Sequence, residues 1–154
     1  MKKVTNIACC CVSAIVETFS RRTLFGHAAV VLSMLGIAAL AFGLWVHHMF
    51  AVGLPRLGND FYTAASMAVA LPAGIQIFCW IATLGSGRPR FATPLLWVIG
   101  FILTFVIGGL SGVMTASAPL DQQLTDTYFV VAHFHYVLVG GAIFPLLGAF
   151  TYWY

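Results

Sequence analysis

The chain has 154 residues, of which 61% are hydrophobic and only 7% are charged, and its mean hydropathy is +0.98. Soluble domains carry about 25% charged residues, so this composition excludes an ordinary soluble protein and predicts an integral membrane protein. The formal net charge of +3 comes from a few scattered lysines and arginines, which excludes nucleic acid as an expected partner.

The segment before the first long apolar stretch is expected to be a short N-terminal helix remnant. Its apolar part, residues 4–16, is too short to cross a bilayer, which takes about 20 residues. Lys2 and Lys3 followed by small apolar residues resemble a signal peptide. However, Asn6 interrupts the apolar run, and Glu17 follows it without a cleavage-like boundary. Processing of this segment is therefore the alternative interpretation.

Four later stretches are long and apolar enough to cross the membrane as helices. They run from about residue 25 to 46, 61 to 84, 93 to 116 and 128 to 154. Polar or turn-forming residues bound them at 20–23, 54–60, 85–90 and 119–126. The predicted fold class is therefore all-α: a polytopic transmembrane helix bundle of four full spans joined by short loops.

Arginines predict how this bundle is oriented. Arg21 and Arg22 fall in one loop, and Arg88 and Arg90 fall in the next loop on the same side. The two other loops contain three aspartates and the single Arg56. Because positive charges concentrate in inner loops, the arginine pairs are expected to face inward. The opposite, outer side then receives four of the five histidines: His47, His48, His133 and His135.

His133 and His135 lie inside the last span, where ionisable residues usually mark a functional site. Residues two apart on a helix point roughly 200° away from each other, so these imidazoles cannot easily bind one metal ion. A flat cofactor on each side of the helix, such as haem bound through iron, would give each imidazole its own partner. Structural histidines that hydrogen-bond between helices are the alternative.

His47 and His48 end the first span. Neighbours on a helix differ by about 100°, so the two side chains can share one ion only where the helix ends or is distorted. Residues 49–55, which include Gly53 and Pro55, form such an ending. Imidazole suits copper, so the pair is a candidate copper site. An interfacial pair without metal is the alternative.

Two motifs carry a resemblance to a known family: WVHHMF at 45–50 and DTYFVVAHFHYVL at 126–138. They resemble the C-terminal half of the catalytic core of subunit I in the haem-copper oxidases, the family that includes cytochrome c oxidase. The resemblance extends from about residue 16 to 154 and includes ETFSRR, PAGIQIF and GGLSGV. The whole chain, 1–154, is thus expected to be one partial subunit I core.

The resemblance implies a role for each candidate residue. His47 and His48 would bind the active-site copper. His133 would be the proximal ligand of a high-spin haem iron, and His135 an axial ligand of a low-spin haem iron. The implied cofactors are two haems, expected to be of the A type, and copper. Asp126 is a candidate ligand of a nearby magnesium or manganese ion.

Two departures from the family affect these expectations. Family members carry a His-Pro-Glu-Val-Tyr motif before the arginine pair, which supplies a third copper histidine, whereas this chain begins with MKKV at about that point. We therefore expect a fragment that is inactive alone and needs the remaining part of subunit I. Relatives also carry threonine and lysine where this chain has Ala73 and Gln76. Because Gln76 cannot titrate, a proton route through this position would need other groups.

The implied function is that of a terminal respiratory oxidase in a bacterial inner membrane. Such an enzyme transfers electrons from cytochrome c to dioxygen, forms water and translocates protons, and its implied partners are the other oxidase subunits and the lipid bilayer. Quinol is an alternative electron donor. A different class of function remains open: a non-catalytic multi-span membrane protein, or an inactive remnant, in which the histidines are structural.

Overall fold

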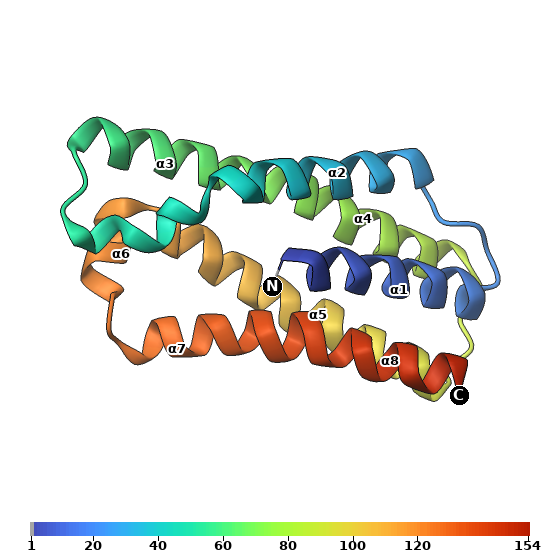
Figure 1. Cartoon of the computed structure of the whole chain (residues 1–154). Coiled ribbons are helices and arrows are strands. Elements are labelled where there is room, and N and C mark those ends of the chain that lie inside the picture. Colours follow the sequence, from blue (N-terminus) through green and yellow to red (C-terminus); the bar gives the residue numbers. More distant parts are fainter. Residues whose placement is uncertain (1) are drawn as a thin grey trace.

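The computed structural model describes the backbone of residues 2–154 and the side chains from Ala8 onward. Within this part of the chain the regular elements are all helices, and they run lengthwise beside one another (Figure 1). Four helical stretches are long and apolar enough to cross a membrane: His27–Val52, Arg56–Ser86, Thr93–Thr115 and Tyr128–Trp153. The predicted all-α bundle with four spans is confirmed.

The first two spans are each interrupted. The first consists of α2 (His27–Gly43) and the 3₁₀ helix η1 (Trp45–Val52), and the second of α3 (Arg56–Ala68) and α4 (Ala70–Ser86). The break at Val69 lies three residues before Pro72, which has no N–H to donate to the Ala68 carbonyl.

Two of the span boundaries predicted from the sequence differ from those in the structure. The first span continues to Val52 through η1 instead of ending near residue 46. The second begins at Arg56, so residues 56–60, assigned to a loop, are helical. Pro55 explains this early start, because its extended backbone (φ −55, ψ 147) places it immediately before the first helical turn.

The third span is the single helix α5 (Thr93–Thr115), within one residue of its predicted bounds. A short helix, α6 (Ala118–Leu124), lies in the connection predicted as a loop. The fourth span comprises α7 (Tyr128–His135), the π-helical segment η2 (Tyr136–Ile143) and α8 (Phe144–Trp153). Pro145 follows η2 and cannot donate to the Gly141 carbonyl, which accounts for the irregular helix there.

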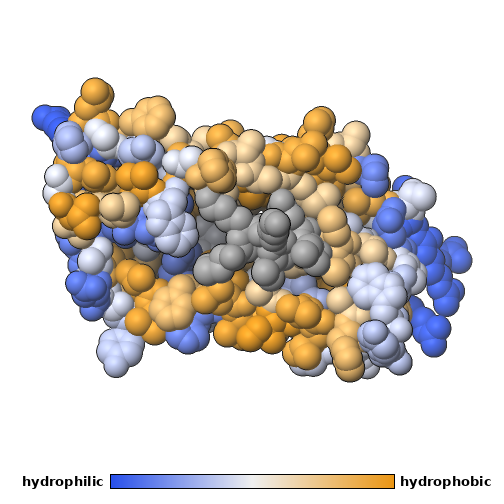
Figure 2. Space-filling view, in the orientation of Figure 1, coloured by the Kyte–Doolittle hydropathy of each residue, from blue (hydrophilic) through white to orange (hydrophobic). Residues whose placement is uncertain are grey.

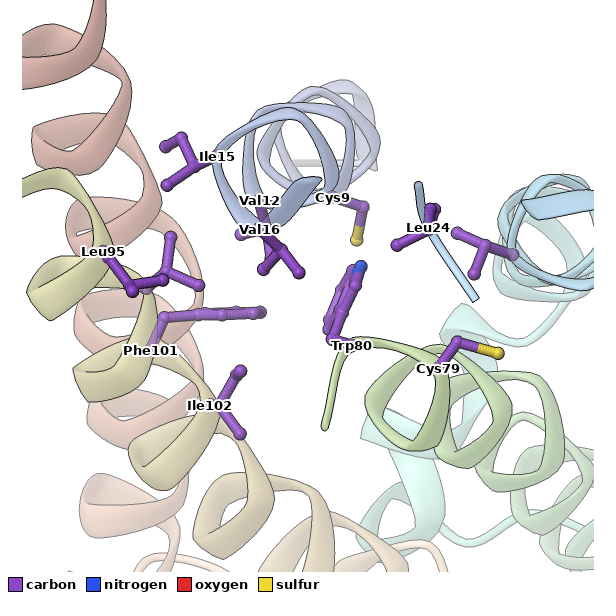
Figure 3. Packing of buried hydrophobic residues seen from close by; sticks show 12 residues of the cluster. Cys9, Val12, Ile15, Val16, Leu24, Cys79, Trp80, Leu95, Phe101 and Ile102 are labelled. Carbon is purple, nitrogen blue, oxygen red and sulfur yellow. The ribbon is translucent and has the colours of Figure 1, made fainter. Parts of the chain in front are cut away.

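The predicted short N-terminal helix is present, and its apolar part is shorter than the four spans. It is the 19-residue helix α1 (Lys2–Ser20), which contacts α2, α4, α5 and α8. Cys9, Val12 and Val16 recur at helical spacing and are buried at its contact face. In Figure 3 they point toward the fully buried Trp80 and Phe101 of α4 and α5. This helix therefore supplies the centre of the packed core.

Glycines let α5 approach the last span closely. A Cβ added at Gly108 would lie 3.1 Å from Val137, and one added at Gly140 would collide with Thr104. Small residues at such positions allow two membrane helices to pack backbone against backbone. The contact between α5 and η2 thereby fixes the position of α7, the helix that carries the last two histidines.

The bundle has two distinct ends (Figure 1). The histidine end comprises η1, α6 and the beginning of α7, drawn at the left. The arginine end comprises the loops at 20–26 and 87–92 together with the C-terminus of α8, drawn at the right. Candidate cofactor ligands and most of the basic residues are therefore separated by the length of the spans.

Candidate haem and copper site

Two neighbouring histidines at the end of the first span bring their rings together. His47 and His48 lie in η1, just before Met49 leaves helical geometry (φ −122, ψ 17). Their Nε2 atoms are 3.0 Å apart, and their ring centroids are 4.3 Å apart. Regular helical spacing would turn the two side chains apart. Their convergence therefore depends on side-chain orientation at an irregular helix end.

Neighbouring side chains hold both rings in place. The Nδ1 atom of His47 hydrogen-bonds with the hydroxyl of Ser66 on α3, at 3.0 Å, and Ser66 is buried. The indole ring of Trp45 packs against the ring of His48 with centroids 4.9 Å apart. These contacts restrict the rings before any ligand binds, which is how outer neighbours orient metal-binding histidines.

The spacing of the two nitrogen atoms fits one copper ion. With metal–nitrogen bonds of about 2.0 Å, two imidazole nitrogens bound at right angles lie about 2.8 Å apart. The 3.0 Å between the Nε2 atoms of His47 and His48 matches two adjacent coordination positions. Copper also needs further ligands. Among the described residues, no group of three or more His, Cys, Asp or Glu side chains comes together, so other groups would have to complete the site.

His133 points from α7 toward α5. Its Nδ1 atom lies 3.1 Å from the Gly108 carbonyl oxygen and 3.0 Å from the Ser111 hydroxyl. Because a carbonyl can only accept, the first bond places the proton on Nδ1. The Nε2 atom then keeps its lone pair and can bind a metal, the arrangement usual for metal-ligating histidines. Gly112 leaves the space that the ring occupies.

His135 has different surroundings from His133. Its Nδ1 atom donates to the Val131 carbonyl of its own helix at 2.7 Å, which again leaves Nε2 unprotonated. Its ring lies 4.4 Å from that of Phe134, and its side chain is exposed, whereas His133 is half-buried against α5. The two imidazoles can therefore ligate two separate cofactors, and His135 could reach one outside the described helices.

The histidine end gathers residues from three parts of the chain. His48 interacts electrostatically with both His133 and Asp121 of α6. The Thr125 hydroxyl donates to the Asp121 carboxylate at 3.4 Å. Burial nevertheless raises the pKa of Asp121, because the charged form is partly removed from water, while Thr125 and His48 oppose this shift. His47, His48 and His133 therefore all belong to the histidine end, and His48 lies within electrostatic range of His133.

Asp126 lies at the turn between α6 and α7. Its side chain is exposed, and its backbone has φ 62, a left-handed conformation that aspartate tolerates better than most residues. Magnesium requires octahedral oxygen ligands and usually keeps several waters. One carboxylate supplies only part of such a site, so the role of Asp126 in binding magnesium or manganese stays a prediction.

Sequence reasoning missed the residues that orient the histidines. Ser66 and Ser111 contact His47 and His133 from helices distant in the sequence. Hydroxyl side chains are common in membrane helices, so composition alone gives no signal for these two. Gly108, Gly109 and Gly112 only weakly indicated that a histidine ring packs here, because such glycines also occur where two helices simply pack closely.

Gln76 is buried in α4, where its side chain is only 3% exposed. The thiol of Cys9 on α1 donates to its Oε1 atom at 3.4 Å, and among the described residues its Nε2 atom has no hydrogen-bond partner. An amide neither takes up nor releases a proton at physiological pH. The Gln76 amide therefore cannot titrate, and only its oxygen atom has a hydrogen-bond partner among the described residues.

We expect that replacing Gln76 by leucine leaves the stability of the folded protein unchanged or raises it by about 1 kcal/mol, because the substitution removes a buried unpaired donor. Gln122→Leu is the matched control, since the Gln122 amide donates to the Phe50 carbonyl at 3.1 Å and links α6 to η1. This control should lower stability by about 1 kcal/mol. Thermal unfolding midpoints in detergent compare the two. A larger loss for Gln76→Leu would contradict the prediction.

The fold and the site together define a class of protein: a polytopic helical membrane protein that presents paired histidines, suited to haem and copper, at one end of its spans. Residues 4–154 match the family described as Cytochrome C and Quinol oxidase polypeptide I. The chain belongs to this family, the predicted resemblance is confirmed, and the protein is an integral membrane protein.

Curated relatives include both types of oxidase. The chain is 48% identical to cytochrome c oxidase subunit 1 of Bacillus sp. (strain PS3), over 92% of this chain and 23% of the relative. It is 45% identical to quinol oxidase subunit 1 of Bacillus spizizenii, over 92% of this chain and 22% of the relative. It is 46% identical to cytochrome c oxidase subunit 1 of Debaryomyces hansenii, over 92% of this chain and 26% of the relative. The chain thus spans about a quarter of the length of the relatives it matches.

Proposed function

We propose that the chain forms part of the catalytic subunit of a terminal respiratory oxidase, located in a bacterial inner membrane. The enzyme would transfer electrons from cytochrome c to dioxygen, form water and translocate protons. The observation that carries this proposal is the placement of the paired His47 and His48 and of His133 at the same end of a bundle whose sequence belongs to the oxidase family.

Each histidine contributes a defined atom to this function. His47 and His48 would hold copper through two Nε2 atoms kept in place by Ser66 and Trp45. His133 and His135 would each ligate a haem iron through Nε2, since a backbone carbonyl holds the proton on Nδ1 in both. When bound, haem and copper supply the redox chemistry that reduces dioxygen.

The protein around these ligands would control access to the site. Four apolar spans keep bulk water away, so protons must reach the histidine end by defined routes. Gln76 cannot carry a proton as a lysine could, so a route through α4 would rely on water or on neighbouring groups. Copper would also require ligands beyond His47 and His48, because no group of three or more such side chains comes together among the described residues. The remaining part of subunit I and the other oxidase subunits are the proposed partners.

Quinol is the second candidate electron donor. It is favoured by one observation: the chain is almost as similar to a quinol oxidase subunit 1 as to a cytochrome c oxidase subunit 1, at 45% against 48% identity.

The test is to assemble the oxidase with this chain and to measure oxygen uptake with reduced cytochrome c and with quinol in parallel. We expect oxygen uptake with one donor, two haem signals in the reduced optical spectrum and one copper per haem pair at the site. The same assembly without this chain is the control. Equal haem content and oxygen uptake in the control would refute the proposal and favour a structural role for the histidines.

A further inference from the structure

Backbone hydrogen bonds connect two segments at the arginine end of the bundle: the end of α1 and the loop after α4. The N–H of Arg88 donates to the Ser20 carbonyl at 2.9 Å, and the N–H of Arg90 donates to the Phe19 carbonyl at 2.8 Å. The loop after α4 therefore lies directly against the end of α1. Arginines from two distant parts of the sequence are held close together by backbone contacts.

A side-chain contact and a glycine strengthen this connection. The guanidinium of Arg22 donates to the Ser86 carbonyl at 2.8 Å. A Cβ added at Gly87 would lie 2.9 Å from the Ser20 Cβ, so the loop can approach this closely only because a glycine stands there. We use the term inner arginine cluster for the four exposed residues that these contacts gather: Arg21, Arg22, Arg88 and Arg90.

The inner arginine cluster is not neutralised by the chain itself. Among the side chains that the structure describes, these guanidinium groups form no ion pair. Glu17 is the nearest acidic residue in sequence, and its carboxylate accepts from the N–H of Leu24 at 2.6 Å. The three aspartates belong to loops or helix ends at the histidine end. Four permanent positive charges are thus left for an external anion.

Exposed aromatic side chains lie at the same end of the bundle as these charges. Phe25 is 49% exposed, and Phe91, beside Arg90, is 68% exposed. The C-terminal end of α8 reaches the same region, because the Tyr152 hydroxyl hydrogen-bonds with that of Thr18 at 3.0 Å. Trp153, next to Tyr152, is 58% exposed. Figure 2 shows hydrophilic residues at this end directly beside the apolar surface of the spans.

From this combination we infer that the inner arginine cluster binds the headgroup of an anionic phospholipid. The guanidinium groups match the geometry of a phosphate, which arginine binds through two parallel hydrogen bonds. The aromatic rings lie where the glycerol and upper acyl region would be, as aromatic residues do at membrane interfaces. A soluble phosphate would satisfy only the charges, whereas a phospholipid satisfies both the charges and the exposed rings.

The experiment measures competition between phosphatidylglycerol and phosphatidylcholine for the assembled oxidase, with bound lipid quantified by mass spectrometry. Arg88→Gln with Arg90→Gln should lower the preference for phosphatidylglycerol by tenfold or more, since one basic residue contributes about fivefold at a membrane surface. Arg88→Lys with Arg90→Lys keeps the charge but loses the paired hydrogen bonds of the guanidinium, so its preference should lie between those of the glutamine variant and the unchanged protein. Soluble glycerol phosphate should not displace the lipid.

Arg56→Gln is the matched control, because Arg56 is an exposed arginine at the opposite end of the same span and should not affect this preference. Haem content shows whether each variant assembles, independently of lipid binding. An unchanged lipid preference in the double glutamine variant would overturn the proposal. Loss of a neighbouring subunit from that variant, with the lipid preference unchanged, would show instead that an acidic protein segment covers the arginines.

Discussion

Under the proposed function, replacing His133 by alanine should remove one of two haems from the assembled oxidase, and replacing His135 by alanine should remove the other. The two rings have separate hydrogen-bond partners and different exposure, His133 against α5 and His135 at the surface. Loss of one ligand therefore leaves the other in place. Each single variant should contain one haem per protein instead of two, and the double variant should contain none.

His27→Ala is the control for these two substitutions. His27 is exposed at the beginning of α2, at the arginine end of the bundle, so its removal should leave both haem signals unchanged. Pyridine haemochrome assays give the haem content, and reduced optical spectra show which signal is lost. If either single variant loses both haems equally while the protein remains folded, the two histidines share one site, and the proposed division between them is wrong.

Replacing Gly112 by alanine should have the second largest effect, although the residue itself binds nothing. Its Cβ would lie 2.9 Å from Cε1 of His133, closer than carbon atoms approach without displacement. The ring must therefore move away from the position in which Gly108 and Ser111 orient it. Disturbing the support of a metal ligand costs about 10- to 100-fold in affinity, so haem occupancy at His133 should fall accordingly.

Gly109→Ala is a closely matched control. An added Cβ there meets no atom within 4 Å, and alanine favours a helix over glycine by up to about 1 kcal/mol. This variant should keep its haem and its stability. Titration of the haem-depleted oxidase with haem compares the two variants. Equal affinities would mean that the space at Gly112 does not determine the position of His133.

Several features of this protein follow from sequence pattern alone. Apolar runs of the length of a bilayer predict four spans, because the membrane requires a fixed hydrophobic length. The motifs around His47 and His133 predict the family, which the family match confirms. The spacing of His133 and His135 also indicates two separate partners, since helical geometry fixes their relative directions.

Other features depend on contacts that no local pattern records. The apolar part of α1 is too short to cross a membrane, yet this helix is central to the core, because Val12 and Trp80 meet only when distant helices pack. Ser66 and Ser111 become partners of histidines for the same reason. Similarly, Arg22 and Arg88 lie in loops far apart in sequence and are joined by the contact between α1 and the end of α4.

The amino-acid sequence thus determined the class of fold, the family and the identity of the candidate ligands, because these depend on composition, hydrophobic length and short motifs. The tertiary structure decided which ligand atoms face one another, which carbonyl groups hold the imidazole protons, and where unpaired charge accumulates. These properties arise between residues that are distant along the chain, and only helix packing brings such residues within hydrogen-bonding distance.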